Sequence, residues 1–383
     1  MRFSFLRGIL LAALAANGAL VALVGCSSHP TANSPAPASS VAAPPSVSAH
    51  LPVAAPSAYV GSAACAECHQ AEYASQSHTR HAETLMAMTR KELGALAPPT
   101  GRIPRTGVLV VQRGGRFGMG LPARSNAIIP LDYALGSGKS GMTYVSLLGD
   151  NTIIEMAMSY FPHQREWHVT PGDEHLSMNK LGRTRPPEDA RTCFSCHAVM
   201  PSTTTVVPPK RFFGVGCESC HGPGGTHITQ MQAGNYGQDT MVRLEKWSAK
   251  RILDLCGQCH GSAQLVMAGA SPASAVGISR FQPFGLAQSQ CFKNSKGTLS
   301  CVTCHDSHTN LSTDQKAYNT VCLSCHTAAT ARRPPLLRTS LIKLCPVNKT
   351  GRCISCHMPS GSVFVNQANP IRMADHFIRV HRP

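Results

Sequence analysis

The sequence predicts a mainly α-helical chain with much irregular structure, a body organised around stacked cofactors, and a small inserted β module. Three observations lead to this fold class. The unit Cys-x-x-Cys-His occurs seven times in 383 residues. Aromatic residues make up only 5% of the chain, so side chains alone would build a thin core. Strand and turn patterns fill residues 101–170, between the first unit and the other six.

The repeated unit is the attachment signature of c-type haem. Two thiols spaced by two residues add to the vinyl groups of a haem, and the adjoining histidine becomes an iron ligand. We number the units motifs 1 to 7 in chain order: 65–69, 193–197, 217–221, 256–260, 301–305, 322–326 and 353–357. The sequence therefore predicts seven covalently attached haems c, which would supply the apolar core that the side chains lack.

The attachment residues follow from the motifs. The expected attachment cysteines are Cys65, Cys68, Cys193, Cys196, Cys217, Cys220, Cys256, Cys259, Cys301, Cys304, Cys322, Cys325, Cys353 and Cys356. The expected proximal iron ligands are His69, His197, His221, His260, His305, His326 and His357. A zinc site or a thioredoxin-like redox pair also uses Cys-x-x-Cys. A histidine directly after the second cysteine in every copy favours haem, because zinc sites place histidines further away.

The N-terminus is typical of a bacterial lipoprotein. Arg2 and Arg7 precede an apolar stretch up to Gly25, as in a signal peptide, and Leu23-Val24-Gly25-Cys26 resembles a lipobox with Cys26 as the lipidated residue. An uncleaved membrane anchor is the alternative, since about 18 apolar residues lie near the lower limit for spanning a bilayer. The residue directly after Cys26 is Ser27 and not an aspartate. By resemblance to other lipoproteins, this favours the outer membrane. We expect a cell-envelope protein with its haem-bearing body outside the cytoplasm.

The expected division of the chain is a signal peptide at 1–25, a lipidated Pro/Ala/Ser tether at 26–58, a first haem segment at 59–100, the β-rich insert at 101–170 and a six-haem domain at 171–383. Within the insert, strand and turn patterns predict a hairpin around Gly114-Gly115 and another around Gly149-Asp150-Asn151. Gly138-Lys139-Ser140 resembles part of a phosphate loop, but Tyr133 stands where its first glycine would be.

The charge of the chain balances its expected cofactors. The formal net charge is +16. Removing the signal peptide leaves about +14, and seven haems add about 14 propionate charges of opposite sign. The basic residues are therefore expected to pair with propionates, and no nucleic-acid partner is expected.

Further histidines are candidates for the distal side of each iron. A helix is expected over residues 70–93, with His78 and His81 on one face together with Leu85 and Met88. Without His29 and His50 of the tether, nine histidines remain for seven distal positions: His78, His81, His163, His168, His175, His227, His308, His376 and His381. Met86, Met88, Met200 and Met358 are possible substitutes, although methionine at such positions is more often core filler.

Chain length limits which iron each histidine can serve. Two histidines on opposite sides of one iron have Cα atoms about 13 Å apart, whereas three extended residues span at most about 11 Å. His308, three residues after His305, therefore cannot complete the haem of its own motif and is expected to reach a neighbouring one. His227, six residues after His221, is expected to cross over as well.

Three cysteines lie outside the motifs. Cys26 is expected to carry lipid, which leaves Cys291 and Cys345 as an even pair in an oxidising compartment. We expect them to form a disulfide.

Several runs resemble a known family. YVGSAACAECH, YALGSGKSGMTYV, GCESCHGPGGTH, LSCVTCHDSH, CISCHMP and the late Asp375-His376-Phe377-Ile378 resemble bacterial multihaem c-type cytochromes related to the tetrahaem cytochrome of hydroxylamine oxidation. The pentahaem ammonia-forming nitrite reductases look like more distant relatives. The resemblance covers roughly residues 59 to 381 and implies that His81, His227, His308 and His376 are distal ligands. Those reductases attach their catalytic haem through Cys-x-x-Cys-Lys, a motif absent here, which argues against nitrite reduction.

Two functions follow from this pattern. The preferred one is electron transfer through seven haems, with other redox proteins as donor and acceptor and a lipid anchor in the membrane. The alternative is a reductase or oxidase of a small nitrogen or sulfur compound at one five-coordinate haem. A homo-oligomer, such as a filament of stacked subunits, is compatible with either function.

Overall fold

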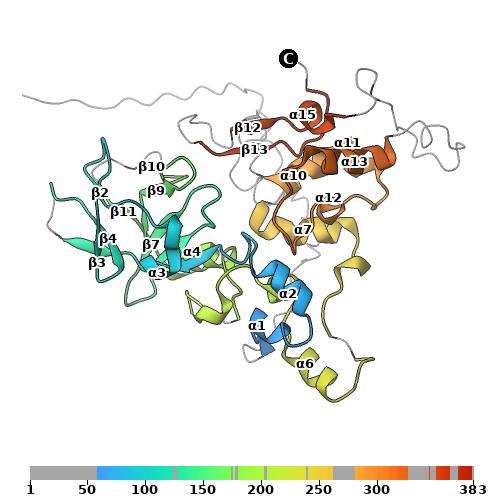
Figure 1. Cartoon of the computed structure of the whole chain (residues 1–383), viewed down its shortest axis with the longest axis horizontal. Coiled ribbons are helices and arrows are strands. Elements are labelled where there is room, and N and C mark those ends of the chain that lie inside the picture. Colours follow the sequence, from blue (N-terminus) through green and yellow to red (C-terminus); the bar gives the residue numbers. More distant parts are fainter. Residues whose placement is uncertain are drawn as a thin grey trace, which may run out of the picture. The chain divides into compact units, whose positions relative to one another are not determined.

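The computed structural model describes residues 58–123, 127–173, 176, 180–201, 205–238, 240–261, 281–326, 345, 351–362 and 370–381. All of them belong to one compact unit, Ser48–Pro383. Short helices and small antiparallel sheets make up this part of the chain (Figure 1). Cys26, the signal and tether segments up to residue 57, and His175 lie outside the described residues.

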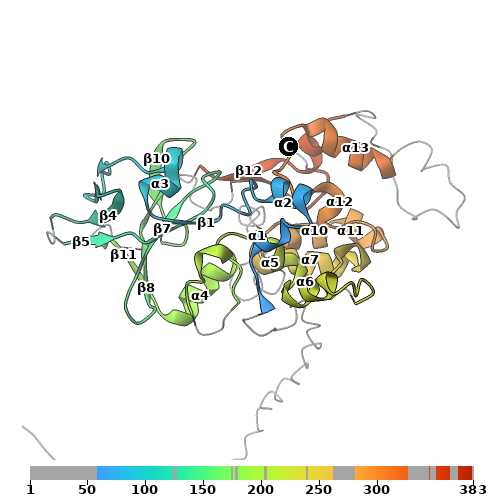
Figure 2. The same cartoon turned by 60° about the horizontal axis from the view of Figure 1, so that its bottom comes forward.

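Short helices carry most of the motifs. The helical elements are α1 Ser62–Cys65, α2 Gln70–Gln76, α3 Arg90–Leu93, η2 Gly94–Leu96, α4 Pro187–Ser195, η3 Lys210–Phe212, α5 Cys217–His221, α6 Gly225–Gln232, η4 Leu244–Lys246, α7 Ala249–His260, α10 Gln282–Gln288, α11 Gln290–Asn294, α12 Cys301–Cys304, α13 Gln315–Cys325 and α15 Cys353–His357. The two longest have N-caps: Ser248 accepts a hydrogen bond from the Arg251 amide before α7, and Asp314 accepts one from the Lys316 amide before α13. Helix α7 packs against α10 and α12 (Figure 2).

The strands are β1 Leu85–Ala87, β2 Gly101–Arg102, β3 Leu109–Arg113, β4 Arg116–Gly120, β5 Ile128–Pro130, β6 Tyr133–Leu135, β7 Thr143–Leu147, β8 Ile153–Met156, β9 Met158–Phe161, β10 Glu166–Val169, β11 Gly182–Arg185, β12 Ser360–Ser362 and β13 Arg372–Ala374. They form sheets of order β1-β6-β7-β8-β11, β2-β3-β4-β5, β10-β9 and β12-β13. The two largest sheets thus draw on residues 85–185, a wider span than 101–170, because β1 and β11 pair with β6 and β8.

Residues 85–185, which we call the β region, contain both predicted hairpins, and the structure confirms them. Strands β3 and β4 pair in register from Leu109↔Gly120 to Arg113↔Arg116, and Gly114 and Gly115 both have positive φ. Two consecutive residues with positive φ are what a two-residue turn between twisted strands requires. Strands β7 and β8 are joined through Asn151, with φ of 65°, and the Asp150 carboxylate accepts a hydrogen bond from the Thr152 amide at 3.0 Å.

The helix predicted over residues 70–93 is confirmed at Gln70–Gln76 and wrong over residues 77–89, while Arg90–Leu93 form the separate helix α3. The Thr79 hydroxyl donates to the Gln76 carbonyl at 2.7 Å and so takes an acceptor that a continuing helix would use. The His81 carbonyl then accepts from the Val215 amide at 2.7 Å, and the Thr84 carbonyl accepts from the Gly136 amide at 2.8 Å. Backbone bonds to distant segments therefore replace the helix, and Leu85 to Ala87 become strand β1.

The β region builds a core from its own side chains. Met88, Val110, Phe117, Met119 and Tyr144 are among its buried residues, with Trp167 packed against them. A second apolar cluster joins the same sheets to α4 and motif 2. Its buried members are Leu85, Leu135, Val145, Ile153, Ala190, Phe194, Ala198 and Val206.

Candidate metal centres

The structure places four motif histidines close to four other histidines. The ring centres of His69 and His227 are 6.3 Å apart, those of His81 and His260 6.0 Å, those of His221 and His308 6.1 Å, and those of His305 and His376 6.2 Å. Each pair joins a proximal candidate of motif 1, 4, 3 or 5 to a residue from another segment of the chain.

This spacing fits a metal ion between the two rings. A bond from an imidazole nitrogen to a metal is about 2 Å long, and the nitrogen lies about 1.1 Å from the ring centre. Two imidazoles on opposite sides of one iron thus have centres about 6.2 Å apart, against 6.0 to 6.3 Å in the structure. Hydrogen-bonded or stacked imidazoles without a metal have no reason to keep this separation in four pairs.

Backbone carbonyls orient several of these imidazoles. The Nδ1 atom of His221 donates to the Val242 carbonyl at 2.8 Å, and that of His376 donates to the Ala374 carbonyl at 3.0 Å. His197 does the same with Thr84 at 2.9 Å, and His357 with Arg379 at 3.0 Å. A ring whose Nδ1 donates to a carbonyl keeps the Nε2 lone pair for a metal.

The surroundings also keep the rings neutral, as a metal ligand must be. Desolvation lowers the pKa of His81, His197, His305 and His376 below its ordinary value. Desolvation, with His81, His376 and His305 nearby, lowers the pKa of His260 to about 4. An uncharged imidazole can donate a lone pair to a metal, whereas a protonated one cannot.

Other candidate histidines have different partners. The His168 ring, on β10, lies 3.0 Å from a carboxylate oxygen of Glu166 and packs edge-on against Phe161. His163 is exposed in the turn before β10, and the His78 Nδ1 donates to the Ala74 carbonyl at 2.8 Å. His381 lies 3.7 Å from the Asp375 carboxylate. In the described part of the chain no ring contact joins His197 or His357 to a second histidine.

The candidate methionines lie elsewhere. Met88 is 1% exposed within the core of the β region, and Met86 packs against that core. Met200 packs against the second apolar cluster. Met358, partly buried, follows directly on motif 7. The pairing of Cys291 with Cys345 stays a prediction.

Cysteines of different motifs are close neighbours. The neighbouring thiol pairs are Cys65 and Cys217, Cys196 and Cys259, Cys256 and Cys301, and Cys322 and Cys353. Cys220 lies near Cys256, and Cys304 lies near Cys322. The motifs therefore follow one another in space in the order 1, 3, 4, 5, 6, 7, with motif 2 beside motif 4.

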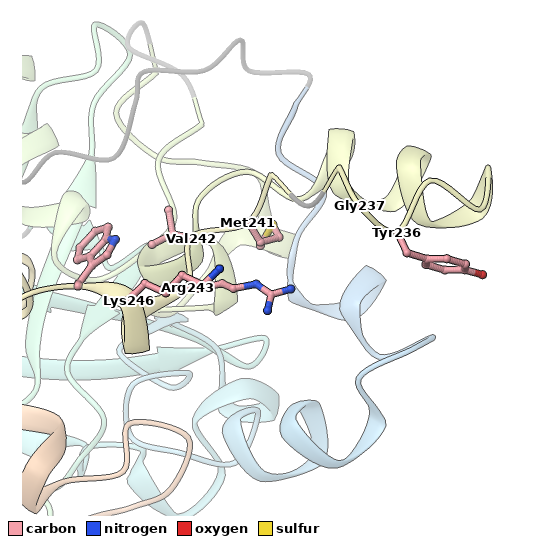
Figure 3. A pocket seen from close by; sticks show the side chains of 7 residues that line it. Tyr236, Gly237, Met241, Val242, Arg243 and Lys246 are labelled. Atoms are coloured by element: carbon pink, nitrogen blue, oxygen red, sulfur yellow. The ribbon is translucent and has the colours of Figure 1, made fainter.

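A hollow of about 430 Å³ lies beside motif 3. Its lining residues are Tyr236, Gly237, Met241, Val242, Arg243, Lys246 and Trp247 (Figure 3). Val242 is the residue whose carbonyl holds His221, so the hollow adjoins the chain segment that orients this imidazole. Arg243 and Lys246 make its rim basic, and the Arg251 guanidinium stacks on Trp247 at 3.7 Å.

Two residues that sequence analysis missed hold these centres in place. The Thr84 hydroxyl donates toward the His197 carbonyl and the His81 carbonyl, each at 3.0 Å, and the Thr84 carbonyl accepts from the His197 ring. Glu218, inside motif 3, is 1% exposed. Neither position follows a periodic pattern. The one sequence signal for Glu218 is that it is an acidic residue inside a haem motif.

Comparisons with known proteins agree with the motifs. The profile of the family described as cytochrome c554 and c-prime matches residues 157–222. The chain also resembles the solved structure of an outer cell wall cytochrome, OcwA, with a TM-score of 0.50 and 18% sequence identity over 84% of this chain and 80% of that one. These findings fit a multihaem c-type cytochrome. They support electron transfer through c-type haems.

A second solved structure is more distant. An undecahaem cytochrome from the S-layer of Carboxydothermus ferrireducens matches with a TM-score of 0.42 and 17% identity, over 86% of this chain and 53% of that one. No curated protein sequence matches the chain at a significant level. In the described residues, no helix is both long and apolar enough to span a bilayer.

Proposed function

We propose that this chain is a lipid-anchored electron carrier of the cell envelope that holds seven c-type haems and performs no substrate chemistry of its own. The observation that carries the proposal is the set of four imidazole pairs, each with ring centres 6.0 to 6.3 Å apart. A haem ligated by two histidines supplies reversible one-electron chemistry without an open coordination site.

The residues divide this work among themselves. The motif cysteines attach the haems, and the motif histidines are the proximal ligands of the irons. His227, His81, His308 and His376 ligate from the distal side at motifs 1, 4, 3 and 5. The remaining distal ligands, at motifs 2, 6 and 7, come from the other candidate histidines except His168, whose Nε2 atom lies 3.0 Å from the Glu166 carboxylate. Ring spacing and the carbonyl acceptors of Nδ1 support these assignments.

The spatial order of the motifs supports transfer along one line with a side branch. Thiols of consecutive motifs in the order 1, 3, 4, 5 are close neighbours, and so are those of motifs 6 and 7. Such close spacing suits electron transfer because tunnelling rates fall steeply with distance. Motif 2, beside motif 4, would form the branch. It packs against the second apolar cluster.

The proposed location rests on the N-terminus and on the similar structures. Cys26 would carry lipid, and residues 27–58 would tether the body to an outer membrane. The printed names of the two similar structures, an outer cell wall cytochrome and an S-layer cytochrome, support an envelope location. We propose the β region as the docking surface for a redox partner.

The experiment that tests this function combines haem quantification with electron paramagnetic resonance on the purified full chain. A pyridine haemochrome assay is expected to return seven haems per chain, and the ferric spectrum is expected to be low-spin throughout. A count well below seven would contradict the attachment sites. A strong high-spin signal that shifts on adding nitric oxide or cyanide would favour the enzyme over the carrier.

A further inference from the structure

Glu218 is a carboxylate enclosed within motif 3. It stands between Cys217 and Ser219, and only 1% of its surface is exposed. Its Oε1 atom accepts hydrogen bonds from the Val60 amide at 3.0 Å and the Gly224 amide at 2.8 Å. Its Oε2 atom accepts one from the Gly61 amide at 2.8 Å. Three backbone donors stabilise the charged form of a buried carboxylate.

These donors come from two sides of the site. Val60 and Gly61 directly precede α1, which leads into motif 1, whereas Gly224 follows motif 3. A Cβ at Gly61, where φ is +87°, would lie 3.0 Å from the Arg211 carbonyl, so glycine allows this close approach. The Ser62 hydroxyl accepts from the Cys217 amide at 3.1 Å. Through these hydrogen bonds, Glu218 therefore links the segment that leads into motif 1 to the start of motif 3.

The charge of Glu218 lies close to both motifs. It is adjacent in sequence to Cys217, whose thiol lies near that of Cys65 of motif 1. Burial and the charge of Glu218 together raise the pKa of Tyr59. Among the ion pairs formed by the described residues, none includes Glu218. Backbone dipoles thus satisfy the carboxylate, and within the described residues no side-chain cation lies at ion-pairing distance from it.

We propose that Glu218 sets the reduction potential at motifs 1 and 3, holding it lower than an uncharged residue would. This inference rests on the proposed function, because it requires haems at these two motifs. A fixed negative charge favours the ferric over the ferrous state, since the ferric iron carries one more positive charge. Burial strengthens the effect because the surrounding medium screens the charge weakly.

The matched experiment compares two acidic residues inside motifs. Glu218→Gln removes the buried charge but keeps the shape of the side chain. Glu67→Gln removes a charge from inside motif 1 at an exposed position, where solvent screens it. Glu218→Asp keeps the charge and changes the packing. Haem content and the individual midpoint potentials are measured for each full-length protein, the latter by spectroelectrochemical titration.

In Glu218→Gln, we expect two of the seven redox transitions to move to higher midpoint potential by at least about 59 mV. For a one-electron transition, this shift is a tenfold change in the ratio of oxidised to reduced haem at a given potential. Glu67→Gln and Glu218→Asp should keep all transitions near the wild-type values. The inference is overturned if Glu218→Gln carries a full set of haems at unchanged potentials, or if Glu67→Gln shifts them equally.

The aspartate variant separates charge from packing. If Glu218→Asp raises the potentials as much as Glu218→Gln, packing is responsible and the inference fails. If Glu218→Gln does not assemble, potentials in Glu218→Asp decide alone: wild-type values support the charge, and raised values reject it. A wild-type chain with few haems would instead contradict the proposed function, which the haem assay detects independently of any potential.

Discussion

Single hydrogen bonds decide which atom of each imidazole can face a metal. The Nδ1 atoms of His221, His376, His197 and His357 donate to backbone carbonyls at 2.8 to 3.0 Å, which leaves Nε2 as the ligating atom. His168 differs, because its Nε2 atom lies 3.0 Å from the Glu166 carboxylate. Histidine count alone does not reveal this difference.

We expect His308→Met to change one haem only. Replacing one of two histidine ligands by methionine raises the reduction potential of a haem. One low-spin bis-histidine signal should disappear from the paramagnetic resonance spectrum, and one titration step should move to higher potential. His168→Met is the matched control and should leave both measurements unchanged. A loss of signal in His168→Met, with none in His308→Met, would contradict the distal assignments.

At the scale of elements, irregular segments position the site more than helices do. The segment after motif 2 returns to motif 2 and to His81 through two backbone bonds: the Gly214 amide donates to the His197 carbonyl at 3.1 Å, and the Val215 amide donates to the His81 carbonyl at 2.7 Å. Gly214 has φ of +80°, and a Cβ there would lie 2.0 Å from the Ala82 carbonyl. Only glycine permits this backbone to come so close.

Gly214→Ala is therefore expected to be severely destabilising. The positive φ alone costs about 1 to 2 kcal/mol for alanine, and the collision with Ala82 adds to it. Gly234→Ala provides the control: φ there is +75°, but nothing lies within 4 Å of the added Cβ. The midpoint of thermal unfolding and the haem content by intact-mass spectrometry should fall much further in Gly214→Ala than in Gly234→Ala, where only the cost of the positive φ applies. Equal effects in the two variants would show that the collision is unimportant.

At the scale of the whole molecule, the structure contains two kinds of core. The β region buries its own side chains, such as Phe117, Met119 and Tyr144, each 2% exposed or less. The motif-bearing helices differ: α12 and α15 have no buried residue, whereas α7 buries Ile252, Leu253 and Leu255. For α12 and α15 the haems must supply the apolar contacts. The expectation that haem provides the core thus applies to these short helices and not to residues 85–185.

This difference predicts how the chain behaves without haem. In protein produced without haem attachment, amides of β3, β4, β7 and β8 should remain protected from hydrogen exchange, because their core needs no cofactor. Amides of α5, α12 and α13 should exchange rapidly. Hydrogen–deuterium exchange with peptide-level mass spectrometry measures both regions in one sample. Protection of α12 and α13 in the haem-free chain, or its loss in β7 and β8, would contradict this division.

Local sequence was sufficient where a pattern has a local cause. Gly114-Gly115 and Asp150-Asn151 predicted their turns correctly, because positive φ and side-chain capping act within a few residues. The helix predicted over residues 70–93 was wrong over residues 77–89 for the opposite reason. The spacing of its apolar residues is a local feature of the sequence. The backbone hydrogen bonds that replace the helix are formed by Val215 and Gly136, which lie far along the chain.

The sequence by itself determined the haem-attachment signature, its seven positions and the inability of His308 to serve the iron of motif 5, since three residues are too short. Only the tertiary structure decided that His308 lies beside His221, His81 beside His260, and His227 beside His69. Short spacings limit what a chain can reach, whereas the choice among distant partners depends on how the whole chain packs.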